Sequence, residues 1–187
     1  MLKETRSGPR WSATRSGTHS ATPLDPRSPP RLPNPPLPMS AVEVPAERLA
    51  DAAQGWADLH ARLAQRYGVY ILAGSLMARA AQGIVNRSYF LSPEGGVDWC
   101  DKLVPTPWER QAISLAPGQE NKLFETPFGK IGIQICYDSE FPLFTRALVE
   151  QGADMILVPS ATEFEAGYTR VRQSCRARAI ESQCLIV

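Results

Sequence analysis

Apolar residues recur at steps of three and four along residues 46–67, and Gly68 follows directly. This spacing places an apolar stripe along one side of an α-helix, and a glycine just after the last turn is a common helix end. We therefore predict an amphipathic helix over Ala46–Tyr67. Residues 141–151 and 169–182 show the same spacing and are predicted to be helices as well.

Short apolar runs bounded by glycine, proline or polar residues lie between these helices, and such runs are typical of buried strands. We predict strands over residues 69–74, 87–92, 97–99, 123–126, 131–136, 155–158 and 184–187. Residues 87–92 and 97–99 are joined by the turn sequence Pro-Glu-Gly-Gly, which predicts a hairpin. Helices that alternate with strands in this way indicate an α/β domain.

The opening segment, residues 1–38, has a different composition. It holds nine of the 17 prolines, and its six Lys and Arg residues stand against two acids. Few large apolar residues lie between them, so burial cannot offset the entropy of ordering the chain. We predict a disordered Ser/Pro/Arg-rich segment over 1–38 and a folded domain over 39–187.

Composition excludes several classes of protein. The 187 residues are 43% hydrophobic and carry a formal net charge of +1, which gives no electrostatic reason to expect nucleic acid binding. No apolar run approaches the roughly eighteen residues that cross a bilayer, and no secretory signal opens the chain. We expect a cytoplasmic protein without a membrane partner. There is no metal ligand set and no glycine-rich phosphate loop, so we expect no cofactor and no metal.

Cys136 is the candidate nucleophile because it ends the predicted strand 131–136, immediately before a predicted helix. Open α/β sheets present reactive groups at this edge, although a free cysteine by itself is more often a small core residue. A thiol needs a base, and only two histidines exist. His19 lies in the Ser/Pro/Arg-rich segment and His60 on a polar helix face, so a carboxylate with a raised pKa is the expected base.

Three ordered segments, residues 101–110, 129–142 and 176–183, resemble motifs of the carbon-nitrogen hydrolases of the nitrilase superfamily. They read DKLVPTPWER, GKIGIQICYDSEFP and RARAIESQ. The resemblance runs from about residue 40 to residue 187. It implies an α/β fold of the α-β-β-α sandwich type and a Glu-Lys-Cys triad that attacks an amide, carbamoyl or nitrile carbon.

By position in these motifs, Cys136 is implied to be the nucleophile that forms a thioester acyl-enzyme. The resemblance likewise implies that Lys102 is the cation that stabilises the oxyanion and that the backbone N–H of Tyr137 completes the oxyanion hole. Glu109 matches a second acid that positions substrate or lysine. The physical reasoning agrees, because a fixed ammonium in a dry pocket stabilises a developing oxyanion.

The general-base glutamate of the superfamily is not found. Where its motif is expected, residues 31–38 read RLPNPPLP, without a carboxylate. Glu43 and Glu47 lie at a predicted helix start, where acids are favoured by the helix dipole. We expect that residues 1–38 are not native domain sequence and that the chain is a member truncated at both ends. The unpaired strand edges left by truncation favour association, and we expect a homo-oligomer.

Three functions compete at this point. The first is a hydrolase of a non-peptide carbon-nitrogen bond in a small molecule, with amide or carbamoyl substrates favoured over nitriles because Tyr137 and Asp138 stand where true nitrilases usually carry Trp-Glu. The second is an inactive relative that acts as a binding or assembly protein. The third is a redox-sensitive thiol protein without hydrolase activity.

Overall fold

The computed structural model of the chain describes residues 44–162 and 164–187. The disordered segment predicted over residues 1–38 lies outside the described residues, and the domain boundary at residue 39 stays a prediction.

Helix α1 (Ala46–Tyr67) has the predicted bounds. It ends at Gly68, whose φ of 61° lies in the left-handed region, and Val69 N–H donates to the Ala64 carbonyl at 3.1 Å. The buried face of α1 consists of five alanines, which are Ala46, Ala50, Ala53, Ala57 and Ala64. Trp56 stays 42% exposed and donates its indole N–H to the Ala73 carbonyl.

The first sheet is antiparallel and is centred on β3 (Gly83–Leu91). One edge of β3 pairs with β1 (Ile71–Leu72) and β2 (Leu76–Ala80), and the other pairs with β4 (Val97–Asp101). The β3–β4 pairing confirms the predicted hairpin. Strand β2 and the first half of β3 were not predicted, and β1 is shorter than predicted because the chain turns at Gly74, whose φ is 65°.

The second sheet has the order β5-β6-β7-β8 and is formed by β5 (Leu123–Thr126), β6 (Gly129–Ile133), β7 (Met155–Leu157) and β8 (Leu185–Ile186). Strands β5 and β6 are antiparallel, whereas β6, β7 and β8 are parallel. The regular part of β6 ends before the predicted residue 136. Its hydrogen bonds to the neighbouring segment continue, since Gln134 N–H donates to Leu157 O and Cys136 N–H donates to Pro159 O, both at 3.0 Å.

Four helical segments follow the strands: α2 (Pro107–Ala112), the short 3-10 helix η2 (Cys136–Glu140), α3 (Pro142–Glu150) and α4 (Glu165–Ser182). Helices α3 and α4 confirm the two predicted helices, but α4 begins at Glu165 rather than at residue 169. Helix α2 was not predicted. It starts with a capping box, in which Thr106 Oγ1 accepts from Glu109 N–H and Glu109 accepts from Thr106 N–H.

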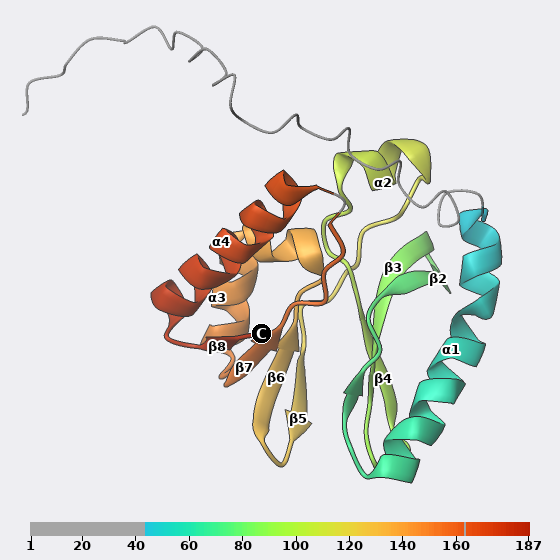
Figure 1. Ribbon diagram of the computed structural model, residues 1–187, viewed down its shortest axis with the longest axis horizontal. Helices are drawn as coiled ribbons and strands as arrows, with labels where there is room; N and C mark the ends of the chain where they lie inside the picture. The colour runs from blue at the N-terminus through green and yellow to red at the C-terminus, as the bar shows by residue number, and fades with distance from the viewer. Residues whose placement is uncertain (1–43, 163) are drawn as a thin grey trace, which may run out of the picture. The chain divides into compact units, whose positions relative to one another are not determined.

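These elements form four layers, with α1, the first sheet, the second sheet, and α3 with α4 in turn (Figure 1). One apolar cluster lies between α1 and the first sheet, and a second joins Phe90 and Cys100 of the first sheet to Phe124, Ile131 and Ile133 of the second. A third includes Leu148 of α3 and Ile156 of β7. The predicted α-β-β-α sandwich is confirmed.

Candidate active site

Cys136 begins η2 at the carboxyl end of the β6 segment, as predicted. Its φ of 48° lies in the left-handed region, which costs a residue with a side chain about 1–3 kcal/mol. The surrounding hydrogen bonds hold this conformation, because Cys136 N–H donates to Pro159 O and Ser139 Oγ donates to Cys136 O at 2.7 Å. The residue is only half-buried, so the strained turn presents a thiol that is not sealed in the core.

Lys102 and Glu109 form a buried ion pair. The Lys102 ammonium donates to both carboxylate oxygens of Glu109, at 2.7 and 2.9 Å, and the two residues are 3% and 8% exposed. Burial by itself raises the pKa of Glu109, but the hydrogen bonds from Lys102 and from Thr106 N–H, together with the charge of Lys102, outweigh it. The pKa of Glu109 therefore lies below its usual range, and the carboxylate is charged at neutral pH.

Asn86 supports this pair from β3. The side-chain amide of Asn86 donates to Glu109 Oε1 at 3.1 Å. The backbone carbonyl of Asn86 accepts from the backbone N–H of Lys102 at 2.8 Å. Sequence reasoning missed Asn86, because nothing in a short polar stretch of strand shows which residue will face a helix 23 positions further along the chain.

Replacing Asn86 by aspartate tests whether the Glu109 carboxylate is held close to residue 86. Asn86→Asp places a second carboxylate against Glu109, which raises the pKa of one member of the pair in the folded state. The added stability loss is present above that raised pKa and disappears as the pH falls below it. We expect the free energy of unfolding in urea to drop by about 1–3 kcal/mol more at pH 8 than at pH 5.

Asn86→Ala is the matched control for this prediction. It removes the same hydrogen bond without adding a charge, so its loss of stability should be equal at the two pH values. If the loss of stability in Asn86→Asp is also equal at pH 5 and pH 8, the Glu109 carboxylate does not lie beside residue 86 as in the structure.

The loop after Lys102 and the turn of Cys136 are joined by the carboxylate of Asp138. This side chain accepts from the backbone N–H groups of Leu103 and Val104 and from that of Ile135. The structure thus brings Lys102 and Glu109 into direct contact and ties their loop to the turn that carries Cys136. Asp138 lies in one of the three sequence motifs, but the sequence does not show which groups it contacts.

The backbone N–H of Tyr137 lies in the first turn of η2. Within the described part of the chain it donates to no backbone or side-chain acceptor. Such a group at the start of a helical turn is free to donate to an oxyanion.

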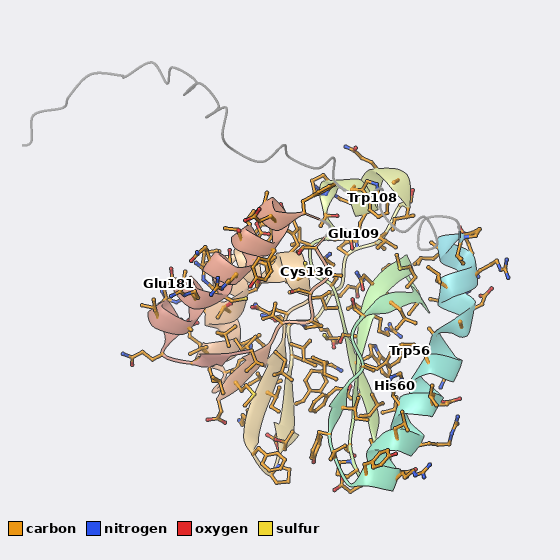
Figure 2. The ribbon with its side chains drawn as sticks, in the orientation of Figure 1. Trp56, His60, Trp108, Glu109, Cys136 and Glu181 are labelled. Atoms are coloured by element: carbon orange, nitrogen blue, oxygen red, sulfur yellow. The ribbon has the colours of Figure 1, made fainter. Side chains whose placement is uncertain are left out.

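His60 lies on α1, outside the first sheet, and its Nδ1 is 2.8 Å from the Trp56 carbonyl oxygen (Figure 2). It is therefore placed away from Cys136. His19, Glu43 and residues 31–38, where the motif of the general-base glutamate is expected, lie outside the described residues. Glu47 is exposed at the start of α1, where the sequence places it.

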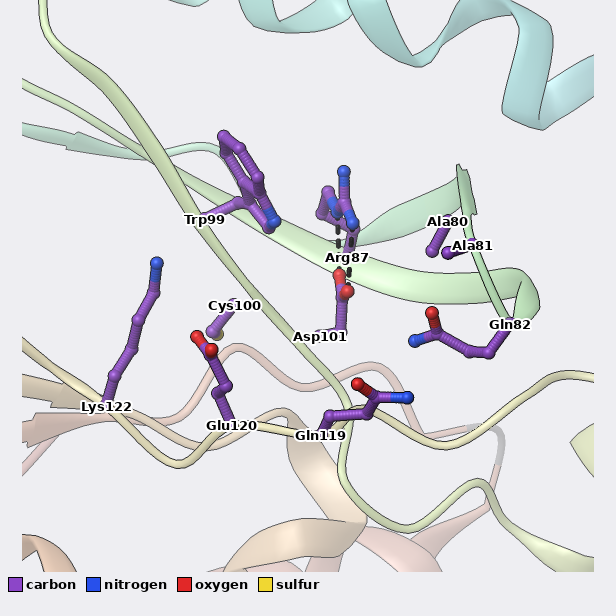
Figure 3. Close-up of a pocket in the computed structure, with 10 residues that line it drawn as sticks. All are labelled: Ala80, Ala81, Gln82, Arg87, Trp99, Cys100, Asp101, Gln119, Glu120 and Lys122. Atoms are coloured by element: carbon purple, nitrogen blue, oxygen red, sulfur yellow. Dashed lines mark hydrogen bonds and ion pairs between the residues drawn. The ribbon is translucent and has the colours of Figure 1, made fainter.

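A cavity of about 310 Å³ lies beside β4, and it includes none of Cys136, Lys102 or Glu109 (Figure 3). Two of its polar residues, Arg87 and Asp101, form an ion pair. Arg87 donates to both carboxylate oxygens of Asp101 at 2.6 and 2.9 Å and stacks over the Trp99 ring. We assign no part of the site to this cavity.

Residues 44–162 and 164–187 contain no group of three His, Cys, Asp or Glu side chains arranged to hold a metal ion. Over the same residues, none of the helices has both the length and the apolar character needed to cross a membrane.

The chain is similar in sequence to known hydrolases and amidases. The chain is 37% identical over 141 residues to the probable hydrolase YhcX of Bacillus subtilis, covering 75% of this chain and 28% of that protein. It is 33% identical to the deaminated glutathione amidase of Yersinia enterocolitica, over 67% of this chain and 48% of that one. The chain thus spans about half or less of these relatives.

A solved structure shares the fold. It is a carbon-nitrogen hydrolase superfamily protein from Xanthomonas campestris with an arsenic adduct in its active site, and it is 27% identical with a TM-score of 0.65. The match covers 75% of this chain and 55% of that chain. The sequence pattern of the carbon-nitrogen hydrolase family matches residues 43–187, most of the chain. The protein therefore belongs to the carbon-nitrogen hydrolase family.

Proposed function

We propose that the protein hydrolyses the carbon-nitrogen bond of a small amide or carbamoyl compound through a thioester on Cys136. The observation that carries this proposal is the buried Lys102–Glu109 pair, held by Asp138 to a strained turn that presents a thiol. An ammonium fixed by a carboxylate in a dry site is suited to stabilise an oxyanion. Charged pairs that serve stability alone are rarely buried so fully, because desolvation offsets most of their attraction.

The reaction begins when the Cys136 sulfur attacks the carbonyl carbon of the substrate. The negative charge then moves to the carbonyl oxygen, where the Lys102 ammonium and the Tyr137 N–H stabilise it. The carbon-nitrogen bond breaks, and the nitrogen leaves with the proton of the thiol. Water then cleaves the thioester to a carboxylic acid and the free thiol. Glu109 positions Lys102 throughout, since both of its oxygens accept from the ammonium.

An amide is favoured over a nitrile for two reasons. Tyr137 and Asp138 follow the nucleophile in place of the Trp-Glu usual in true nitrilases. Relatives about one-third identical to the chain include deaminated glutathione amidases. The cytoplasmic location and the homo-oligomeric state stay predictions.

Intact-mass spectrometry of the full chain incubated with a panel of small amides tests the proposal. We expect an acyl adduct on Cys136 that is absent in Cys136→Ala and strongly reduced in Lys102→Ala. Two matched variants, Cys175→Ala and Lys122→Ala, should keep the adduct, because they remove another half-buried thiol and another ion-paired ammonium. A wild-type chain that forms no adduct, and whose Cys136 is alkylated no faster than Cys100, would contradict the proposal.

A further inference from the structure

The carboxylate of Asp138 is a junction between two remote segments. The residue is 2% exposed. Its Oδ1 accepts from Val104 N–H at 2.9 Å, and its Oδ2 accepts from Leu103 N–H at 3.1 Å and from Ile135 N–H at 3.3 Å. Both oxygens are therefore in use, and they are shared between segments more than 30 residues apart.

The two segments are those that carry the reacting groups. Leu103 directly follows Lys102, and Ile135 directly precedes Cys136. No other side chain among the described residues accepts from the backbone N–H groups on both sides of this junction. A shift of the Asp138 carboxylate would therefore move the Lys102 loop relative to the Cys136 turn.

Each segment is also anchored on its far side. Gly118 N–H donates to Lys102 O at 2.7 Å, which fixes the loop to the chain beside β4. On the other side, Asp138 N–H donates to Ile135 O at 3.1 Å and closes the turn in which Cys136 has a positive φ. With both outer ends anchored, the Asp138 side chain is the adjustable link that sets the spacing between them.

Burying a charged carboxylate at this position costs free energy, because the charge loses its contact with water. Burial raises the pKa of Asp138 to about 6, although the N–H groups of Val104 and Leu103 and the charge of Lys102 act in the opposite direction. A folded-state pKa above the unfolded value means that the folded chain binds the proton more tightly. Stability from this group is therefore greatest at low pH and is lost as the pH rises toward 6, so ionised Asp138 lowers stability at neutral pH.

Asparagine has nearly the same shape and no charge to desolvate, yet it offers only one accepting oxygen. Only a carboxylate accepts from Val104 on one oxygen and from Leu103 and Ile135 on the other. The need for two accepting oxygens explains why a charge is buried here.

We propose that Asp138 is a positioning residue whose two oxygens set the distance and orientation between the Lys102 ammonium and the Cys136 sulfur. This inference rests on the proposed function, because it assigns Lys102 and Cys136 the roles given above. It predicts that the reactivity of Cys136 depends on Asp138 even where the stability of the fold does not.

The experiment measures the rate of alkylation of Cys136 by iodoacetamide, followed by peptide mass, in the full chain between pH 5 and pH 9. We expect Asp138→Asn to alkylate at least about tenfold more slowly at pH 7, equivalent to roughly 1.4 kcal/mol. Its thermal midpoint should not fall below that of the wild type by more than a few degrees, because the variant also removes a desolvated charge. Asp154→Asn is the matched control, since Asp154 also accepts a backbone N–H, from Lys130, but at an exposed position.

A second readout needs no variant. The groups whose charge acts on or responds to Asp138 are Lys102 from the loop and Cys100 from β4. As the pH falls through about 6, Asp138 takes up a proton and can no longer accept on both sides. The wild-type rate should then fall more steeply than the roughly one decade per pH unit expected of a single thiol, whereas Asp138→Asn should keep the single slope.

The outcomes separate the two proposals. If Cys136 of the wild type reacts no faster than Cys175 and is unaffected by Lys102→Ala, the proposed function is wrong. If Cys136 is reactive and depends on Lys102, but Asp138→Asn matches the wild type in rate and slope, the proposed function stands and the positioning role is wrong. Should Asp138→Asn fail to fold, a wild-type profile without the steeper limb below pH 6 overturns the inference by itself.

Discussion

Lys102→Ala is expected to lower the free energy of unfolding at pH 7 by about 3–5 kcal/mol, because it leaves the Glu109 carboxylate buried without its cation. Without its cation, buried Glu109 should have a pKa above its usual range, whereas in the wild type its pKa is lowered. The loss of stability should therefore shrink as the pH falls, because Glu109 then takes up a proton in the folded state. Urea unfolding at pH 7 and pH 5 measures both effects.

Two control variants accompany this prediction. The double variant Lys102→Met with Glu109→Leu should recover most of the stability, because apolar side chains of similar size replace a buried pair without an unpaired charge. It should still form no acyl adduct. Lys122→Ala breaks a pair with Asp98 whose side chains are 32% and 55% exposed, and it should cost less than about 1 kcal/mol. A Lys102→Ala loss as small as that of Lys122→Ala would contradict the buried geometry.

Leu148→Ala is expected to destabilise the fold by about 2–5 kcal/mol while leaving the site chemistry intact. Leu148 is fully buried between α3 and the second sheet, where its Cδ1 lies against the Cα side of Gly132. Truncation removes apolar contacts and leaves a cavity that this close packing cannot fill. Chemical unfolding at pH 7 measures the loss.

The rate of Cys136 alkylation well below the unfolding temperature should stay within about twofold of the wild type in Leu148→Ala, since the substitution changes no group of the site. Leu143→Ala is the matched control, because Leu143 lies on the same helix and is 76% exposed; its effect should fall within about 0.5 kcal/mol. If Leu148→Ala lowers the rate of Cys136 alkylation in proportion to its loss of stability, the reactivity of Cys136 depends on the packing of the core and the prediction is wrong.

The sequence predicted the elements whose signal is local. Helix α1 was placed at its true bounds because its apolar spacing and Gly68 mark both its course and its end. Strand β2 was missed because Arg79 and the alanines around it do not alternate with large apolar residues. Helix α2 was missed even though Thr106, Pro107 and Glu109 together form a capping box that the sequence displays.

The residues of the candidate site also fall into two groups, those with a local sequence signal and those without one. Lys102, Glu109, Cys136 and Tyr137 were predicted from motifs, in which short spacings along the chain set their positions. Asn86 and the contacts of Asp138 were not, because each depends on a partner brought near only by the packing of sheets and loops. Local patterns carry no information on which backbone N–H groups a remote carboxylate will meet.

The span of the Asp138 contacts also has a consequence for how the chain reaches its final state. Its partners Leu103 and Val104 are 35 and 34 residues away, whereas the β3–β4 hairpin closes over a turn of a few residues. Contacts that close long loops form late, since their entropy loss precedes any gain from local pairing. We therefore expect the proposed reactivity of Cys136 to arise only after most secondary structure has formed. A newly made or transiently opened chain should then pass through a stage that has native secondary structure but an unreactive thiol.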